Sequence, residues 1–307
     1  MAGEAPALVL LRACHVPGDA LELPASGYHH HGMIHLTRLS ERGVIEVVGE
    51  DRIAFLQGLV SNDVALAVPG AAVWAALLTP QGKWLADFFV LAQPERLLLD
   101  VDAVSLPMLL QKLTRFRLRS RVALRDISAE LLVHVAWNGA PDLPADAIAA
   151  ADPRLPDAGW RILSPRALAE TATAADWDSH RLFLGLPAAV DMEADKSILL
   201  EAGFDELQGV SWTKGCYMGQ ELTARTKYRG LIKKRLVRVQ VDGALPPPGT
   251  PVLREGREVG MMRSGRDGIG MAQLRLDAMF GELACGDAVL VASPPGWMRL
   301  PVVSAGG

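Results

Sequence analysis

The C-terminal part of the chain, from about Arg235 onward, consists of short apolar runs that are interrupted every few residues by turn-forming stretches. These interruptions are the segments PPPG, REGRE, SGRDG and ACGD. Glycine and proline at this spacing exclude long helices, whereas short antiparallel strands joined by tight turns tolerate them. The pattern therefore predicts a small antiparallel β-barrel or sandwich as a C-terminal domain, over residues 233–307.

The stretch from Met33 to about residue 232 mixes strand and helix patterns without a regular strand–helix–strand rhythm. Alternating or apolar runs such as GVIEVVGED, RLLLDVD and ELLVHVAW are typical of strands, and AAVWAALLTPQGKWLADFFVLA predicts a hairpin. Helical spacing appears in EDRIAFLQGLVSNDV, AVSLPMLLQKLTRF and DWDSHRLFLGLP. We also expect a strand near GWRILS and a short helix after Ser164 and Pro165. The class is α+β, with a body over residues 33–232 that is either one unit or two subdomains divided near 138–160.

Residues 1–32 have a different character. They are rich in glycine and proline, carry the histidine triplet of YHHHGM and show no periodicity. A poorly ordered N-terminal extension explains this composition better than a metal site does.

Bulk composition describes an ordinary globular protein. The chain has 307 residues, a formal net charge of -4 and 50% hydrophobic residues. The three cysteines, Cys14, Cys216 and Cys285, form no CxxC or Cys/His cluster, so neither a disulfide framework nor a zinc site is expected, and no metal ligands are assigned. No targeting segment and no run of about 20 apolar residues is recognisable, which predicts a cytoplasmic protein without a membrane partner.

Cys216 is the most informative single residue, within SWTKGCYMGQELTAR. Lys214 precedes it, and cations near a thiol favour the thiolate. A basic segment follows, without an acid between Glu221 and Asp242. Its cations are Arg225, Lys227, Arg229, Lys233, Lys234, Arg235 and Arg238. The residue types alone leave two interpretations equally open, a reactive thiol or a small buried residue beside a turn.

Two basic segments have alternative interpretations. The segment from Arg225 to Arg238 is equally consistent with a solvated edge strand and with a surface for a polyanion. If RFRLRSRV were extended, the arginines at 115, 117, 119 and 121 would share one side. A solvated sheet face is the favoured reading of that second segment, over an RNA-binding stripe, because no aromatic pair accompanies it.

The segment KGCYMGQELTAR resembles the signature of the YgfZ family, and similarity extends over roughly Met33 to the C-terminus. FLQGLVSNDV, RLFLGLP and GTPVLREGREVGMMRS resemble other segments of that family, and TKYRGLIKKRL resembles its mitochondrial branch of iron–sulfur assembly factors. The matching motif residues are Lys214, Gly215, Cys216, Tyr217, Gly219, Gln220, Glu221 and Arg225.

The resemblance implies an aminomethyltransferase-like body that binds tetrahydrofolate in a central cavity, followed by a small β-barrel. Candidate cofactor-binding residues are Asn62, Asp87, Arg181 and Glu221. The aminomethyltransferases have two adjacent carboxylates in the hairpin, whereas QGKWLADFF keeps only Asp87, after Ala86. Glycine-cleavage activity is therefore not expected, and whether the protein is an enzyme stays open.

The function implied is that of an accessory factor for assembly or repair of [4Fe–4S] clusters in target enzymes, including radical enzymes that modify tRNA. Its functional thiol would be Cys216, and its partners would be iron–sulfur scaffold or carrier proteins, client enzymes, folate and, through contact, tRNA. A single cysteine cannot hold a cluster that takes four thiolates, so partners must supply ligands. The alternatives are a folate-dependent one-carbon transferase, and an adaptor that binds RNA or a scaffold protein.

Overall fold

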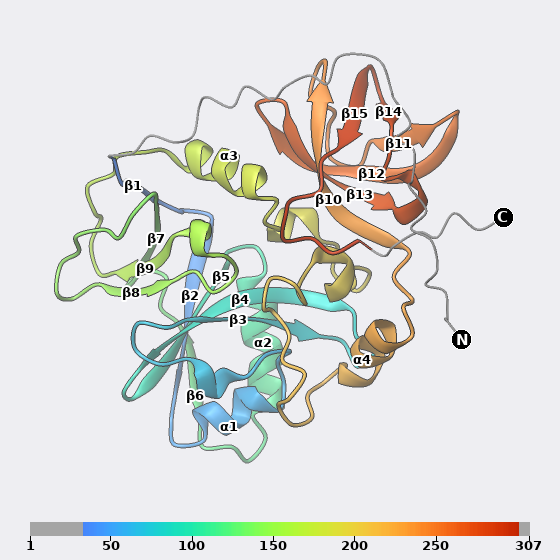
Figure 1. The fold of residues 1–307 in the computed structure, drawn as a ribbon. Helices are drawn as coiled ribbons and strands as arrows, with labels where there is room; N and C mark the ends of the chain where they lie inside the picture. Colours follow the sequence, from blue (N-terminus) through green and yellow to red (C-terminus); the bar gives the residue numbers. More distant parts are fainter. Residues whose placement is uncertain (1–32, 301–307) are drawn as a thin grey trace, which may run out of the picture. The chain divides into compact units, whose positions relative to one another are not determined.

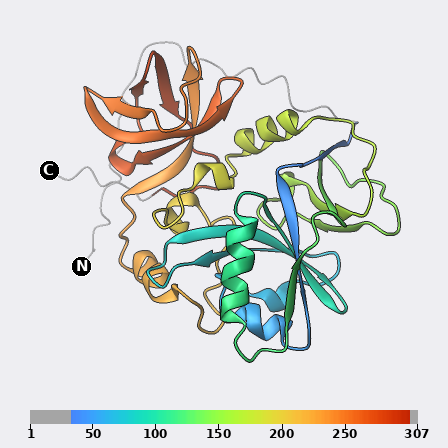
Figure 2. The same ribbon diagram turned by 180° about the vertical axis from the view of Figure 1, so that it is seen from behind.

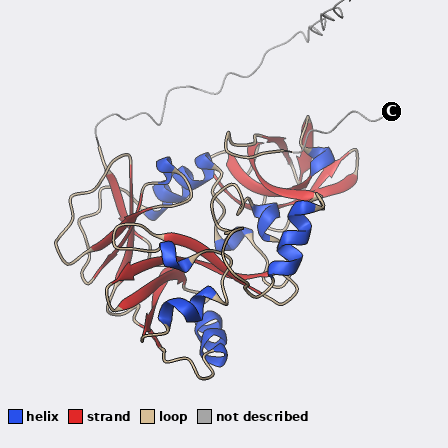
Figure 3. Cartoon of the chain, turned by 60° about the horizontal axis from the view of Figure 1, so that its bottom comes forward, coloured by secondary structure: helices blue, strands red, loops and turns tan. Residues whose placement is uncertain are grey.

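The structure is a computed structural model that describes residues 33–300, so the expected N-terminal extension, residues 1–32, lies outside the described residues. The described part contains a five-stranded sheet, a four-stranded sheet and a closed barrel, with helices between and around them (Figures 1 and 3). This mixed content confirms the expected α+β class. Most strands and helices lie where the sequence patterns place them.

The five-stranded sheet is antiparallel and forms the centre of the body. Its strands, in spatial order, are β3 (Val73–Leu78), β4 (Trp84–Gln93), β5 (Arg96–Asp102), β2 (Arg42–Val48) and β6 (Ala123–Asp126). The central strands are buried on both faces, which explains why their sequences are nearly continuous apolar runs rather than strict alternations.

Two helices cover one face of this sheet, α1 (Arg52–Gln57) and α2 (Leu106–Phe116) (Figure 2). In α2 the buried residues Leu106, Leu109 and Leu113 follow one another at helical spacing and pack against the sheet. Pro107 lies in the first turn, where proline is tolerated because its missing N–H has no partner in the helix.

The opposite face packs against a second layer. Its four-stranded sheet has the order β1 (His35–Arg38), β7 (Leu132–Trp137), β9 (Trp160–Ser164) and β8 (Ile148–Ala151). Helix α3 (Ala174–Leu184) adds to the same core. A capping box of Thr173 and Asp176 begins α3, and Gly185 ends it in the left-handed conformation.

The C-terminal segment forms a closed antiparallel barrel with its own core. The turn-rich sequence left a barrel or a sandwich open, and the resemblance to the YgfZ family implied the barrel. The strand order is β10 (Lys234–Asp242), β13 (Ile269–Arg275), β12 (Arg257–Arg266), β11 (Pro251–Arg254), β14 (Glu282–Cys285) and β15 (Ala288–Ala292). Closure leaves the barrel without open sheet edges, which such short strands would otherwise expose.

The remaining elements are short and connect the layers. Single-turn 3-10 helices occur at Val64–Leu66, Pro156–Ala158, Ala189–Asp191, Leu199–Ala202 and Leu276–Ala278. Helix α4 (Gln220–Tyr228) follows the cysteine loop and leads into β10. The sequence patterns did not predict α4, because a helix with one buried residue, Thr223, has no apolar stripe.

Two local expectations are wrong. No helix follows Pro165, because residues 165–173 are irregular and the helical signal begins only at the Thr173 cap. The arginines of RFRLRSRV do not share a sheet face, because α2 continues through Phe116 and a turn from Arg117 to Ser120 follows it.

Candidate functional site

Cys216 is exposed, in the loop that joins the body to α4, whereas Cys285 is buried inside the barrel. The neighbouring Gly215 has no other atom within 4 Å of the position its β-carbon would take. Of the two alternatives for Cys216, the buried turn-side residue is thereby excluded by its exposure. The Cys216 thiol is at the surface, whereas the side chains on either side of it, Lys214 and Tyr217, are buried.

Lys214 holds the loop from the N-terminal side. Its ammonium donates hydrogen bonds of 2.8 Å to the carbonyl oxygen of Val60 and 2.7 Å to that of Asn62. It also lies 5.3 Å from the centre of the Tyr217 ring, in a cation–π contact. Burial lowers the pKa of Lys214 to about 8. The ammonium is therefore engaged with backbone of the body, and Lys214 is an anchor of the loop.

The residues after Cys216 are anchored as well. Tyr217 is buried in the core between the two sheets, and Met218 packs against the core on the α1 and α2 side. Burial raises the pKa of Tyr217 to about 12. Cys216 therefore lies between Lys214, which is bound to backbone carbonyls, and the pair Tyr217 and Met218, which pack in separate cores.

The loop rests on a segment that follows α1. Ser61 donates from its hydroxyl to the carbonyl of Gly209 at 2.7 Å, and its own carbonyl accepts from Ser211 N at 3.0 Å. The side-chain amide of Asn62 donates to the carbonyls of Trp74 and Gln208. These bonds explain why the Ser-Asn pair follows α1, because both side chains tie the cysteine loop to β3.

Helix α4 begins against the turn of the β3–β4 hairpin. Gly219 has φ of 82°, and a β-carbon there would lie 2.6 Å from the carbonyl oxygen of Thr79 and 3.0 Å from Cα of Gly82. Two glycines distant in sequence therefore allow backbone to pack on backbone. Gln220, Glu221 and Arg225 all lie on α4.

The basic segment is divided by the fold. Lys227 pairs with Asp205 and stacks 3.9 Å from the Trp212 ring centre, and Arg235 is buried with Glu206. Arg238 donates to the carbonyls of Phe183 and Ser293. The remaining cations have no side-chain hydrogen bond or ion pair within residues 33–300, namely Arg225, Arg229, Lys233 and Lys234. Only these four cations of the described segment, fewer than the sequence suggested, are available to a partner, and they follow Cys216 closely in the sequence.

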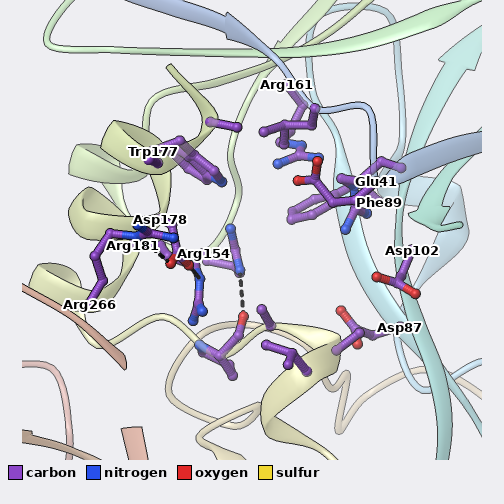
Figure 4. A pocket seen from close by; sticks show the side chains of 18 residues that line it. Glu41, Asp87, Phe89, Asp102, Arg154, Arg161, Trp177, Asp178, Arg181 and Arg266 are labelled. Carbon is purple, nitrogen blue, oxygen red and sulfur yellow. Dashed lines mark hydrogen bonds and ion pairs between the residues drawn. The ribbon is translucent and has the colours of Figure 1, made fainter. Parts of the chain in front are cut away.

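A cavity of about 300 Å³ lies between β4 and α3 (Figure 4). Trp177 and Arg181 enter it from α3, and Phe89 and Asp87 from β4 on the other side. Both oxygens of the Asp87 carboxyl accept from indoles, from Trp74 Nε1 at 2.9 Å and Trp84 Nε1 at 3.1 Å. Burial raises the pKa of Asp87 above its ordinary value, although the two indole donors and Arg42 oppose this change.

Buried charged groups form a network at one wall of the cavity. The buried carboxylate of Asp100 binds the guanidinium groups of both Arg42 and Arg161. Burial alone would raise the pKa of Asp100, but the attraction of Arg161 and Arg42 outweighs it and the pKa is lowered. Arg161 also lies 4.3 Å from the centre of the Phe89 ring. Two cations share one carboxylate beside this aromatic wall.

The residues expected to bind a cofactor do not all meet. Asp87 and Arg181 line the cavity, whereas Asn62 and Glu221 do not. Arg181 already donates to Asp178, Asp191 and Ser264, and so joins α3 to the barrel. The walls that sequence reasoning missed are Phe89, Arg161 and Trp177, which carry no motif and were indistinguishable from core residues.

Comparison with known proteins agrees with this architecture. Residues 233–300 match the family model of the CAF17 C-terminal β-barrel domain. The crystal structure of the glycine cleavage system aminomethyltransferase T from Bartonella henselae superimposes with a TM-score of 0.69 over 87% of each chain, at 16% identity. This confirms the aminomethyltransferase-like fold with a C-terminal barrel; at that identity it shows the fold alone.

Similar sequences are named as iron–sulfur cluster assembly factors. A homologue from Mycosarcoma maydis is 38% identical over 69% of this chain, which spans 59% of that protein. The mouse protein IBA57 is 33% identical, with 80% of this chain and 79% of the relative covered. For human IBA57 the identity is 34%, with 87% and 85% covered.

These relatives correct the expected cytoplasmic location, because all three are named as mitochondrial. That expectation rested on finding no recognisable targeting pattern in the sequence, and such a negative result does not establish a location. No helix within residues 33–300 is long and apolar enough to cross a bilayer. By its identity to the mouse and human proteins over most of their length, the chain belongs to the IBA57 family of iron–sulfur cluster assembly factors.

Proposed function

We propose that the protein is an accessory factor for the assembly or repair of [4Fe–4S] clusters, and that Cys216 contributes one thiolate to a cluster carried by a partner protein. The observation that supports this most directly is the exposed thiol held between anchored neighbours. A thiol presented in this way can approach a cluster on another protein without prior rearrangement of its own chain.

The partner has to supply the other ligands. A [4Fe–4S] cluster normally takes four thiolates, and no group of three or more His, Cys, Asp or Glu residues within residues 33–300 is arranged to hold a metal. Cys285 is buried in the barrel and cannot join Cys216. The cluster is therefore cargo in this proposal, and the site is complete only in a complex with a scaffold or carrier protein.

The surroundings of the thiol suit such a partner. A cluster held by thiolates is anionic, and Arg225, Arg229 and Lys233 are cations without a side-chain partner in the described part of the chain. Tyr228 and Leu231 add apolar surface in the same segment, with 74% and 49% of their surfaces exposed. Aromatic and cationic side chains around a central anchor are typical of protein–protein contacts.

Tetrahydrofolate is the second part of the proposal, and the cavity lining fits it. Trp177 contributes an aromatic ring to the lining, and the carboxyl of Asp87 can form a hydrogen bond to ring nitrogen atoms of a pterin. Arg266 lies at the exposed side of the cavity, where it can attract the carboxylates of a glutamate tail. Bound folate would supply one-carbon chemistry, while these residues bind and orient it.

A folate-dependent one-carbon transferase is the alternative favoured by a specific observation, the buried Asp87 in the cavity. It predicts turnover of a methyl or aminomethyl donor that depends on Asp87 and not on Cys216. Radical enzymes that modify tRNA remain proposed clients. We propose that the chain has two domains. Residues 33–232 form the folate-binding body, and residues 233–307 form the barrel domain.

The test compares wild type with Cys216→Ala, with Cys285→Ala as a matched control that removes a thiol elsewhere. Each variant is expressed in cells lacking the protein, and aconitase-type and radical-enzyme activities are measured together with the abundance of the folded variant. We expect Cys216→Ala to be folded and inactive in support of these enzymes, and Cys285→Ala to support them. Full support by folded Cys216→Ala would overturn the proposal.

A further inference from the structure

The turn after α2 carries an unusual surface at the end of the body away from the barrel (Figure 2). Leu118 exposes 88% of its surface at the tip of this turn, and Phe116 beside it exposes 37%. Leu118, Phe116 and the cations Lys112, Arg115, Arg117 and Arg119 are here called the α2 tip. No acid occurs in the sequence between Asp102 and Asp126.

The cations of the α2 tip are not used by the fold. None of the four makes a side-chain hydrogen bond or ion pair with the described part of the chain. The neighbouring acids, Glu50 and Asp51, are paired with Arg121, whose backbone N–H also donates to Asp51. The positive charge of the tip is therefore available to something outside the chain.

The backbone conformation at the apex of the turn does not favour a leucine. A hydrogen bond from Ser120 N to the carbonyl of Arg117 closes the turn, and Leu118 has φ of 44° at its second position. Glycine, asparagine and aspartate dominate such positions, because a positive φ strains a residue with a β-carbon. A leucine here combines a strained backbone with a side chain that is 88% exposed, and both features are unfavourable for the isolated chain.

The shape and chemistry of the α2 tip fit a lipid surface better than RNA or a protein. An exposed leucine finds no partner on a nucleic-acid backbone, where aromatic stacking is the usual apolar contact. A tip of a few side chains is too small for a stable protein interface, which buries more than about 1,000 Å². Anionic membranes, by contrast, attract clusters of cations and accept single apolar side chains among their headgroups.

We propose that the α2 tip docks the protein reversibly on an anionic lipid surface, with Leu118 inserted between headgroups and the four cations against their phosphates. This departs from the expectation of no membrane partner, and it is independent of the function proposed for Cys216. Each arginine near an anionic surface strengthens binding by about fivefold. Burial of part of one leucine side chain contributes about tenfold. Docking of this kind is weak and reversible.

The experiment is flotation of the full chain with vesicles of phosphatidylcholine containing one third phosphatidylglycerol, and with vesicles of phosphatidylcholine alone. Leu118→Asn should weaken binding to the anionic vesicles about tenfold. The triple variant Arg115→Gln, Arg117→Gln, Arg119→Gln should weaken it by about a hundredfold. Val104→Asn is the control, because Val104 is 90% exposed and precedes the other end of α2. Thermal unfolding of each variant confirms that it is folded.

We expect wild type and Val104→Asn to bind the anionic vesicles and not the neutral ones. Cys216→Ala should bind the anionic vesicles as strongly as wild type does. Binding of wild type that is no stronger to anionic vesicles than to neutral ones would overturn the proposal. So would equal losses in Leu118→Asn and Val104→Asn. A third contrary outcome is binding of a single-stranded RNA oligonucleotide that the triple variant abolishes, together with vesicle binding that Leu118→Asn leaves unchanged.

Discussion

Gly219 and Gly82 pack backbone against backbone, so that a β-carbon on Gly219 would lie 3.0 Å from Cα of Gly82. This contact fixes the start of α4 on the turn of the β3–β4 hairpin. It therefore sets the position of the loop that displays Cys216 relative to the central sheet.

Gly219→Ala should lower the free energy of unfolding by about 3 kcal/mol, because it adds a clash with backbone to the strain of a positive φ. Gly230→Ala is the matched control, since Gly230 also has a positive φ, 59°, but no atom within 4 Å of the added β-carbon. That control should lose only about 1 kcal/mol. Urea unfolding measures both, and equal losses would show that the close packing contributes nothing.

Lys214→Met should loosen the cysteine loop, because the carbonyls of Val60 and Asn62 lose their shared donor. Leaving buried acceptors unsatisfied costs about 1–3 kcal/mol. Limited proteolysis should cut residues 211–219 faster than in wild type. The control is Lys233→Met, which removes an exposed cation beyond α4 that makes no side-chain hydrogen bond or ion pair within residues 33–300, and it should be cut as wild type is. An unchanged cleavage rate in Lys214→Met would contradict the anchoring role.

Cys216 should react with thiol reagents faster than Cys285 does in the folded protein. In the folded protein, Cys216→Ala should remove one thiol that reacts within seconds with a chromogenic disulfide reagent, because Cys216 is exposed. Cys285→Ala should leave that fast phase unchanged, since the Cys285 thiol becomes accessible only on unfolding. Slow modification of Cys216 in the native state would be inconsistent with the displayed loop.

Asp100→Asn should destabilise the body by about 3–5 kcal/mol at neutral pH, because it leaves the guanidinium groups of Arg42 and Arg161 buried without their carboxylate. The pKa of Asp100 is lowered below its ordinary value of 3.8, so its contribution is present above that value and is lost as pH falls through the folded-state pKa. The difference in unfolding free energy between wild type and Asp100→Asn should therefore shrink in acid. A difference that stays constant down to about pH 2 would argue against this linkage.

Asp87→Ala should weaken tetrahydrofolate binding by about tenfold, because it removes the buried hydrogen-bonding carboxyl from the cavity. Asp205→Ala is the control, since Asp205 binds Lys227 and Trp212 and does not line the cavity. Titration calorimetry measures both affinities. Undiminished affinity in a folded Asp87→Ala variant would remove Asp87 from the site.

Local patterns were sufficient for much of the fold. The hairpin β3–β4 follows from two apolar runs around Pro-Gln-Gly, and α2 follows from leucines at helical spacing. Helix α4 escaped prediction because its sequence is polar on nearly every side and it is stabilised by packing at its start. The helix expected after Pro165 failed for the opposite reason, since a plausible cap was not followed by residues that pack as a helix.

Local sequence identified few of the residues that line the cavity. Asp87 was identifiable only through the resemblance to the aminomethyltransferases, because it matches one of the two carboxylates in their hairpin. Phe89, Arg161 and Trp177 come from two strands and a helix, and nothing in their local sequence separates a wall of the cavity from the core.

The sequence by itself determined the succession of strands and turns, the presence of a C-terminal domain of short antiparallel strands, and the motif around Cys216, because periodicity, turn residues and short motifs are local properties of the chain. Only the tertiary structure decided what the motif residues do. Lys214 and Val60 are separated by 154 residues, yet their hydrogen bond makes the lysine an anchor of the loop. Such a role depends on which distant backbone atoms packing brings within reach of an ammonium group, and packing is a property of the whole fold.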